Sequence, residues 1–220
     1  MRSMTRSTDF LAAIAHLPVG ATLVVPDVDW ESYEELLDNL SDRPALRVSY
    51  DTGRLEIVSP LPKHESYKEI LACLVRAFAE ETDAPLEALG STTWKRRKLL
   101  KGAEPDGCFY VANASRITGK EDLDLNVDPP PDIAIEIDTT RSSLSKFPIY
   151  AALGVPEMWR CDGKTVQIHL LKDGAYVKTE AGGFLVGLTG AILTEFLGVG
   201  RAQGQTATLK LFRKRIRSGL

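Results

Sequence analysis

The chain has 220 residues, of which 44% are hydrophobic, and its formal net charge is −3 at pH 7. This length and composition suffice for one medium-sized globular domain with a buried core. The slightly acidic balance excludes a strong overall attraction to nucleic acid, so any contact with DNA has to rely on local basic patches.

The cysteine pattern and the absence of long apolar runs narrow the class of protein further. Cys73, Cys108 and Cys161 are far apart and form no CxxC pair, which argues against a zinc ribbon and a disulfide framework. We expect a disulfide-free protein of the reducing cytoplasm. The N-terminus does not have the pattern of a signal peptide, and no stretch reaches the ~18 apolar residues of a membrane span.

The first part of the chain predicts a helix, a hairpin and a longer helix. Asp29 is a capping residue in front of a segment whose apolar side chains recur at helical spacing up to Leu40. An Asp-Thr-Gly turn predicts a β-hairpin whose strands are Leu46–Tyr50 and Arg54–Val58. An apolar stripe from about His64 to Glu81 predicts a long amphipathic helix.

The second part alternates strands and helices. The basic segment Thr92–Leu100 is ambiguous between strand and helix. The expected elements after it are strands at Asp106–Val111, Pro131–Asp138, Glu157–Cys161, Thr165–Leu171 and Ala175–Thr179, a helix from Lys146 to Leu153, and C-terminal helices from about Leu188. This order predicts an α/β (α+β) fold with a mixed β-sheet flanked by helices. We expect residues 1–45 to be an N-terminal extension packed on a core domain at 46–220.

The strand that begins at Pro131 carries unlike side chains on its two faces. Three isoleucines alternate with Asp132, Ala134, Glu136 and Asp138. Isoleucine favours a buried strand, and buried carboxylates need compensation, which a hard divalent cation such as Mg²⁺ or Mn²⁺ provides. Residues two apart on a strand are roughly 6.6 Å apart, so Glu136 and Asp138 suit one ion, whereas Asp132 lies too far from Glu136.

A second acid has to come from a neighbouring strand, and Asp106 is the candidate. It follows a proline and precedes apolar residues, as Asp132 does. Each Pro-Asp pair is also compatible with a simple turn at the start of a strand. Lys146 lies near the start of the next helix, where it serves either metal-assisted phosphodiester hydrolysis or merely the helix terminus. His64 either points into the same cleft or is a solvated residue at a helix start.

Two basic runs are candidate contacts for DNA. Lys95, Arg96, Arg97 and Lys98 form the first, with Lys101 nearby, and Arg213 to Arg217 form the second. Most such runs are solvated faces or tail ends, so this alternative stays open for both.

Several of these residues together resemble a known family. Glu104-Pro105-Asp106, Pro131-Asp132 with Glu136, Lys146 with Tyr150, and the segment GVPEMW at 154–159 resemble the Uma family of restriction-type endonucleases. The resemblance covers roughly Leu46 to Tyr176. It implies the restriction-endonuclease-like fold of the PD-(D/E)XK superfamily, with Asp106 and Glu136 as metal ligands.

The resemblance also implies a mechanism, and the chain departs from the superfamily pattern at one step of it. Mg²⁺ or Mn²⁺ would polarise the phosphate, while a lysine stabilises the developing charge. The superfamily has that lysine two residues after the acid, where this chain has Asp138. Lys146 would replace it from the following helix. Asp138 would either bind a second metal ion or pair with Lys146. Asp132 would then shape the start of the strand.

Two other functions remain compatible with the same residues. A nuclease fold retained only for binding DNA or protein would keep the acids as remnants, and a hydrolase of another phosphoester would use them unchanged. We further expect a homodimer, because many endonucleases cut both strands as dimers, and light scattering tests this.

Overall fold

A computed structural model describes the chain except for residues 1–10, 12, 15, 41–45 and 139–145. Residues 139–145, between the central strand and Lys146 in the sequence, are therefore outside the described part of the chain. Among the described residues, none of the helices is long and apolar enough to cross a membrane. All three cysteines are free.

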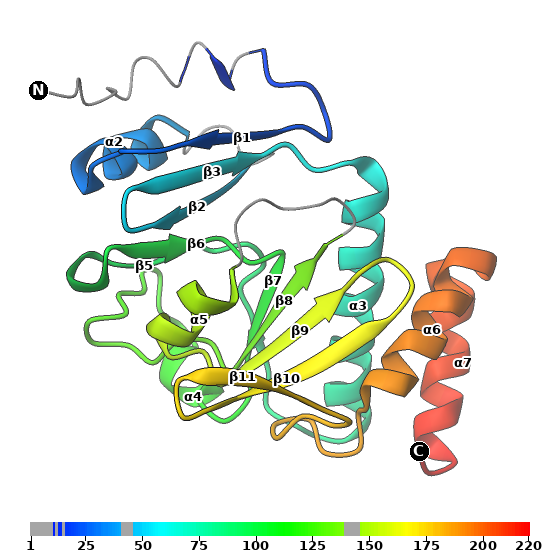
Figure 1. Cartoon of the computed structure of the whole chain (residues 1–220). Coiled ribbons are helices and arrows are strands. Elements are labelled where there is room, and N and C mark those ends of the chain that lie inside the picture. Colours follow the sequence, from blue (N-terminus) through cyan, green and yellow to red (C-terminus); the bar gives the residue numbers. More distant parts are fainter. Residues whose placement is uncertain (1–10, 12, 15, 41–45, 139–145) are drawn as a thin grey trace, which may run out of the picture.

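The fold is a mixed α+β arrangement of two sheets flanked by helices (Figure 1). The first sheet, sheet A, is antiparallel and has the order β1-β3-β2-β6-β5. Its strands are β1 (Thr22–Val25), β2 (Arg47–Asp51), β3 (Arg54–Val58), β5 (Trp94–Arg96) and β6 (Lys101–Ala103). The hairpin β2–β3 is the one that the Asp-Thr-Gly turn predicted, and the ambiguous segment 92–100 becomes β5 followed by the 3-10 helix Arg97–Leu99.

The second sheet, sheet B, contains the acid-bearing strand near its middle, in the order β11-β10-β9-β8-β7-β4. Its strands are β4 (Glu87–Ala88), β7 (Gly107–Tyr110), β8 (Ile133–Ile137), β9 (Glu157–Cys161), β10 (Val166–Lys172) and β11 (Ala175–Thr179). Only β8 and β9 are parallel, and helix α5 (Phe147–Leu153) connects them. The mixed sheet is therefore confirmed, but sheet A was not expected as a separate sheet.

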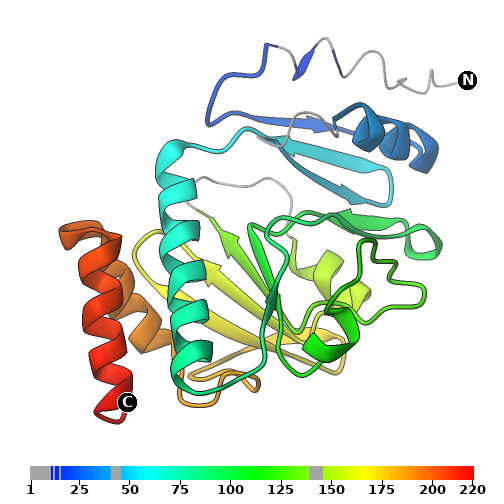
Figure 2. The ribbon, with the colours of Figure 1, turned by 180° about the vertical axis from the view of Figure 1, so that it is seen from behind.

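Helices cover both faces of sheet B. The long helix α3 (Pro62–Glu81) runs along one face, with α6 (Gly190–Gln203) and α7 (Gln205–Arg217) beside it (Figure 2). The short helix α4 (Ala114–Ile117) follows β7, and α5 lies on the opposite face from α3. Gly154 ends α5 with φ 84°, a backbone conformation that glycine adopts without the steric penalty of a Cβ.

The alternation in β8 separates two hydrophobic cores. Ile133, Ile135 and Ile137 pack with residues of α3, α6 and α7. Ala134 points to the other face and packs with Ile149 and other residues of α5. Glu136 follows Ala134 on that second face because strand residues two apart point the same way.

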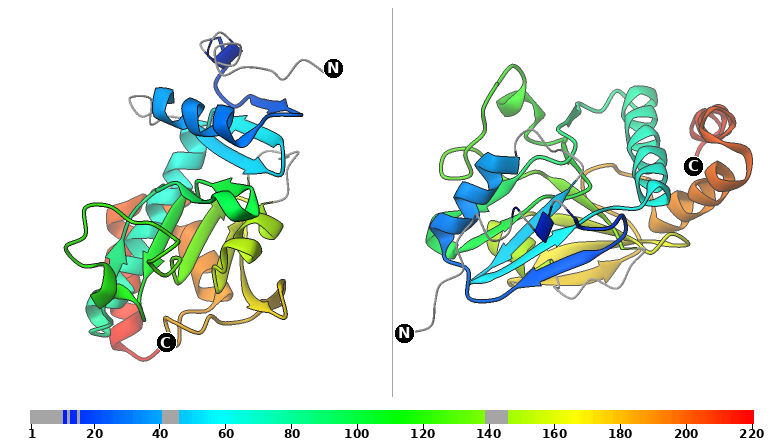
Figure 3. Two further views of the ribbon diagram at one scale, coloured as in Figure 1. Left: turned by 90° about the vertical axis from the view of Figure 1, so that its left-hand side faces the viewer. Right: turned by 90° about the horizontal axis from the view of Figure 1, so that it is seen from above.

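A third core joins sheet A to helix α2 (Trp30–Leu40), which the side chain of Asp29 caps by accepting a hydrogen bond from Ser32 N at 2.6 Å. Figure 3 shows α2 lying against the strands of sheet A. The rings of Tyr33 and Tyr50 stack with centroids 4.7 Å apart. A Cβ at Gly102 would lie 2.2 Å from the Tyr33 hydroxyl, so only glycine permits this approach. Sheet A thus has one apolar face, and its other face is free to carry polar side chains.

Candidate active site

The chain passes from sheet A to sheet B at Glu104-Pro105-Asp106, between β6 and β7. Gly107 pairs with Ile135 across the antiparallel β7–β8 ladder, so Asp106 stands opposite Glu136. Backbone N–H of Asp106 donates to Ile135 O at 3.0 Å. Residues directly opposite in such a ladder share a face, with Cβ atoms roughly 4.5–5.5 Å apart. The two acids that the sequence singled out are therefore neighbours on adjacent strands.

Asp106 is buried, and its two oxygens have different surroundings. Oδ2 accepts a hydrogen bond from Ile137 N at 2.7 Å and lies 3.2 Å from His64 Nε2. Oδ1 is 3.5 Å from Arg47 Nε, and no described residue donates a hydrogen bond to it. Burial opposes ionisation of Asp106, but His64 and Lys146 outweigh it and hold the pKa of Asp106 below its usual value. Asp106 is thus an ionised carboxylate, one oxygen of which faces Arg47 but accepts no hydrogen bond from a described residue.

Glu136 makes two contacts with helix α5 and its start. Oε2 lies 2.8 Å from Lys146 Nζ, and Oε1 accepts a hydrogen bond from the Tyr150 hydroxyl. Burial raises the pKa of Glu136 to about 7, against the opposing effect of Lys146 and with a further contribution from Asp106. A glutamate with this pKa changes its charge near neutral pH, as catalytic carboxyl groups do.

Lys146 is the N-cap residue of α5, and its amine reaches back to the end of β8. Burial lowers the pKa of Lys146, but the negative charges of Glu136 and Asp106 raise it by a larger amount, so the net pKa is above the usual value. The lysine is therefore a cation beside both acids. This is the position that the sequence predicted for a lysine moved to the following helix, and its catalytic role stays a prediction.

His64 joins the same cluster from the first turn of α3. Burial lowers its pKa, but the hydrogen bond and the charge of Asp106 raise it more strongly, so the net pKa is higher than usual. Its other nitrogen, Nδ1, is buried and receives no hydrogen-bond partner among the described residues. The imidazole orients the Asp106 carboxylate rather than lying solvated at a helix start.

Two other predicted residues lie outside this cluster of contacts. Asp138 follows β8 and forms an ion pair with Arg160 of β9. Asp132 lies at the opposite end of β8, where its oxygens accept hydrogen bonds from Val111 N at 2.7 Å and from Asn113 N at 3.0 Å. Asp132 thus holds the turn after β7, as expected for a residue that shapes the start of the strand. The metal-binding role of Asp138 has no support from its contacts.

The two basic runs mostly pair with acids of the chain itself. Lys95 Nζ lies 2.9 Å from Glu34 Oε1 of α2, and Arg97 also contacts α2 acids. Arg96 donates to the carbonyl of Leu125. Lys98 forms no ion pair that the structure describes, and it lies in the 3-10 helix after β5. Contact of Lys95, Arg96, Arg97 and Lys98 with DNA stays a prediction.

Sequence reasoning missed three residues of the cluster. Arg47 of β2 and Glu56 of β3 are buried charged residues that belong to the polar face of sheet A. The charge of Glu56 contributes to the raised pKa of Lys146. Tyr150 was part of the family resemblance without a role of its own, and its hydroxyl contacts Glu136. The alternation of charged residues in the β2–β3 hairpin was the available signal, but a solvated face gives the same pattern.

A divalent cation fits the donors of this cluster in part. The buried Oδ1 of Asp106, which accepts no hydrogen bond from a described residue, and the carboxylate of Glu136 are hard oxygen ligands of the kind that Mg²⁺ and Mn²⁺ take. Within the described residues there is no group of three or more His, Cys, Asp or Glu side chains arranged to hold a metal ion. An ion here would therefore need backbone carbonyl oxygens or water to complete its shell.

The sequence pattern of one family matches residues 30–201, and the chain belongs to that family, Uma2, described as "Putative restriction endonuclease". The identification from residue motifs is thereby confirmed. A comparison with curated proteins found no match.

A solved structure supports the fold independently. It is the crystal structure of "a putative nuclease belonging to DUF820" from Anabaena variabilis, with 17% sequence identity and a TM-score of 0.51. The similarity covers 73% of this chain and 98% of that one. At this identity the likeness establishes the fold, and the restriction-endonuclease-like architecture expected from the sequence is confirmed.

Proposed function

We propose that the chain is a metal-dependent endonuclease that hydrolyses phosphodiester bonds of DNA. The observation that carries this proposal is the pairing of Asp106 with Glu136 across β7 and β8, with Lys146 Nζ 2.8 Å from Glu136. The two acids on one face supply oxygen ligands for a metal ion, and the lysine supplies a positive charge for the phosphate in the transition state of hydrolysis. Membership of a restriction-endonuclease family supports the same reaction.

Asp106 and Glu136 would hold Mg²⁺ or Mn²⁺, with Oδ1 of Asp106, which accepts no hydrogen bond from a described residue, as the first donor. When bound, the ion supplies Lewis-acid polarisation of the phosphate and a more acidic water. Glu136 has to be ionised to take part, and its pKa of about 7 makes this sensitive to pH near neutrality. His64 keeps Asp106 oriented through the contact at Oδ2.

Lys146 would stabilise the negative charge that develops on the phosphate oxygens. Its amine is held by Glu136 and lies beside the position that an ion at the two acids would occupy. An ammonium group placed in a site largely shielded from water stabilises an oxyanion more strongly than the same group in solution. The Tyr150 hydroxyl donates a hydrogen bond to Glu136 Oε1 and so fixes the position of the second oxygen of that carboxylate.

Calorimetry with Mg²⁺ or Mn²⁺ tests the proposal directly, with cleavage of plasmid DNA measured on the same preparations. We expect wild-type protein to bind the ion and cut DNA, and Asp106→Asn and Glu136→Ala to lose both properties. If the protein binds DNA but neither binds the ion nor cuts the DNA, the alternative is correct, namely a nuclease fold retained for binding. Hydrolysis of other phosphoesters without DNA cleavage would identify a different substrate.

A further inference from the structure

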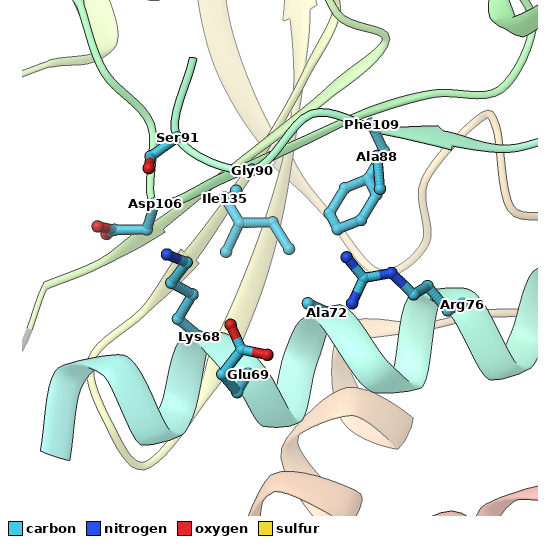
Figure 4. A pocket seen from close by; sticks show the side chains of 11 residues that line it. Lys68, Glu69, Ala72, Arg76, Ala88, Gly90, Ser91, Asp106, Phe109 and Ile135 are labelled. Atoms are coloured by element: carbon cyan, nitrogen blue, oxygen red, sulfur yellow. The ribbon is translucent and has the colours of Figure 1, made fainter. Parts of the chain in front are cut away.

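A pocket opens beside Asp106, between α3 and sheet B (Figure 4). Its volume is about 130 Å³. Small residues make the space: Ala72 on the helix, Ala88 and Gly90 near β4, and Gly107 on β7. A Cβ at Gly107 would approach no heavy atom closer than 3.8 Å, so the space there is real. The proposed hydrolytic mechanism makes no use of this pocket.

The pocket combines an apolar floor with a polar rim. Phe109 and Ile135 form the floor, and Figure 4 shows the Phe109 ring facing the space. The rim carries donors and acceptors of hydrogen bonds, namely Lys68, Glu69, Arg76, Ser91 and Asp106. Apolar walls with a few convergent polar groups are the usual form of a site for a small ring-bearing ligand.

The two cations at the rim differ in the partners that the protein gives them. Figure 4 shows the Arg76 guanidinium turned toward the pocket, and Arg76 forms no ion pair with any residue that the structure describes. Lys68 Nζ is 3.3 Å from Glu65 Oε2, and Figure 4 shows its side chain rising from the helix on the side of Asp106. Glu69 is exposed and lies one residue further, on the same rim.

The charge balance distinguishes a nucleobase from a phosphate group as the occupant. Two carboxylates, Glu69 and Asp106, line the pocket together with the two cations, so a phosphate dianion would meet repulsion as well as attraction. Its floor would also place phosphate oxygens against Phe109 and Ile135, where they find no hydrogen-bond donors. A neutral base presents both donors and acceptors on its edge and an apolar ring face, which the rim and the floor match.

The volume limits the size of that base. A cavity of about 150 Å³ holds one benzene ring, so a pocket of this size accommodates a single ring rather than a purine. We propose that the pocket beside Asp106 binds one unstacked pyrimidine base of the substrate strand, with Phe109 and Ile135 against the ring, and Glu69 and Arg76 on its polar edge. The inference rests on the proposed function, because it places the base next to the phosphate that Asp106 and Glu136 would cleave.

Binding of mononucleotides to the metal-free full chain tests the inference without requiring hydrolysis. Calorimetric or NMR titration would compare dCMP and dTMP with dGMP, deoxyribose 5-phosphate and inorganic phosphate. We expect the pyrimidine nucleotides to bind about tenfold more tightly than deoxyribose 5-phosphate, a difference of about 1.4 kcal/mol. Equal binding of phosphate alone, a preference for dGMP, or no saturable binding of dCMP and dTMP would overturn the inference.

Variants locate the binding. Gly107→Val fills the pocket from β7 and should remove the advantage of dCMP over deoxyribose 5-phosphate. Gly183→Val is the matched control, since a Cβ there meets no atom within 4 Å and Gly183 lies outside the pocket. Glu69→Gln and Arg76→Gln change exposed rim residues and threaten the fold less, and each should reduce the advantage of dCMP over deoxyribose 5-phosphate, a ratio in which the effect of the charge change on the phosphate cancels. Rim variants that keep the wild-type ratio would refute the assignment.

The two proposals fail separately in these experiments. If wild-type protein cuts no DNA but the nucleotide preference and its loss in Gly107→Val are found, the endonuclease function is wrong and the base pocket stands. If DNA is cut and both Gly107→Val and Arg76→Gln bind mononucleotides like wild type, the base pocket is wrong and the endonuclease function stands.

Discussion

Two glutamates of this chain contact basic side chains at similar distances, yet their pKa values shift in opposite directions. Glu136 lies 2.8 Å from Lys146, and burial raises its pKa to about 7. Glu81, at the end of α3, lies 2.7 Å from Arg217 and 2.9 Å from Arg213 of α7, and these hydrogen bonds lower its pKa to about 2. The presence of an ion pair therefore does not determine the sign of the shift.

The difference comes from the partners, because the side chains of Glu136 and Glu81 are similarly exposed, at 11% and 12%. Lys146 is only 14% exposed, so both charges of that pair have lost most of their hydration, and the second acid Asp106 is nearby. Glu81 faces two arginines, and Arg217 is 69% exposed, so water keeps solvating that pair from the arginine side. Removing a charge from water costs more free energy than the attraction of one partner restores. An exposed ion pair loses little hydration and contributes little to stability. Functional sites are places where proteins keep a buried ion pair despite this desolvation cost.

Glu136→Gln should produce the largest effect, because it keeps the shape of the side chain but removes its charge. We expect DNA cleavage to fall by about 10²–10³-fold or more, as when a group that stabilises the transition state is lost. Supercoiled plasmid relaxation with Mg²⁺ measures this, with a urea unfolding curve to verify that the variant is folded. Cleavage within tenfold of the wild-type rate would contradict a catalytic Glu136.

Lys146→Ala should reduce cleavage by about ten- to a hundredfold and leave metal affinity undiminished, since Lys146 repels the ion rather than binding it. Lys146→Arg should not restore the full rate, because a planar guanidinium does not place its charge where an ammonium does. Single-turnover cleavage and calorimetry on the same variants separate the two effects. A Lys146→Ala protein that cuts like wild type would reduce Lys146 to a helix-terminus cation.

The stability of the metal-free protein should reflect the raised pKa of Glu136. A group with a folded-state pKa above its unfolded value of 4.5 contributes stability that is complete below 4.5 and lost as pH rises through about 7. We expect the free energy of unfolding of wild type, relative to Glu136→Gln, to decrease between pH 4.5 and 7. Urea unfolding in EDTA at several pH values measures it, and parallel curves for the two proteins would contradict the shift.

Much of the site could be predicted from sequence because its signals are local. The isoleucine alternation in β8 fixed which side chains share a face, and Asp106 and Glu136 do lie opposite each other. Arg47 and Glu56 were not found, since a strand face turned toward a buried site and one turned toward water show the same alternation. Sheet A itself depends on pairing β2 with β6, more distant in sequence, which no local pattern specifies.

Glu81→Ala completes the comparison and should have the smallest effect. Its lowered pKa means that its contribution to stability is present above the unfolded value of 4.5 and lost as pH falls through about 2, the reverse of Glu136. Because the pair with Arg217 is at the surface, we expect only a slight fall in thermal midpoint at pH 7. In 1 M salt, where the Debye length is about 3 Å, that difference should shrink further. DNA cleavage should stay unchanged. A large loss of stability would show that the α3–α7 contact depends on this ion pair, and the exposure of the basic partners would then not be what distinguishes the two glutamates.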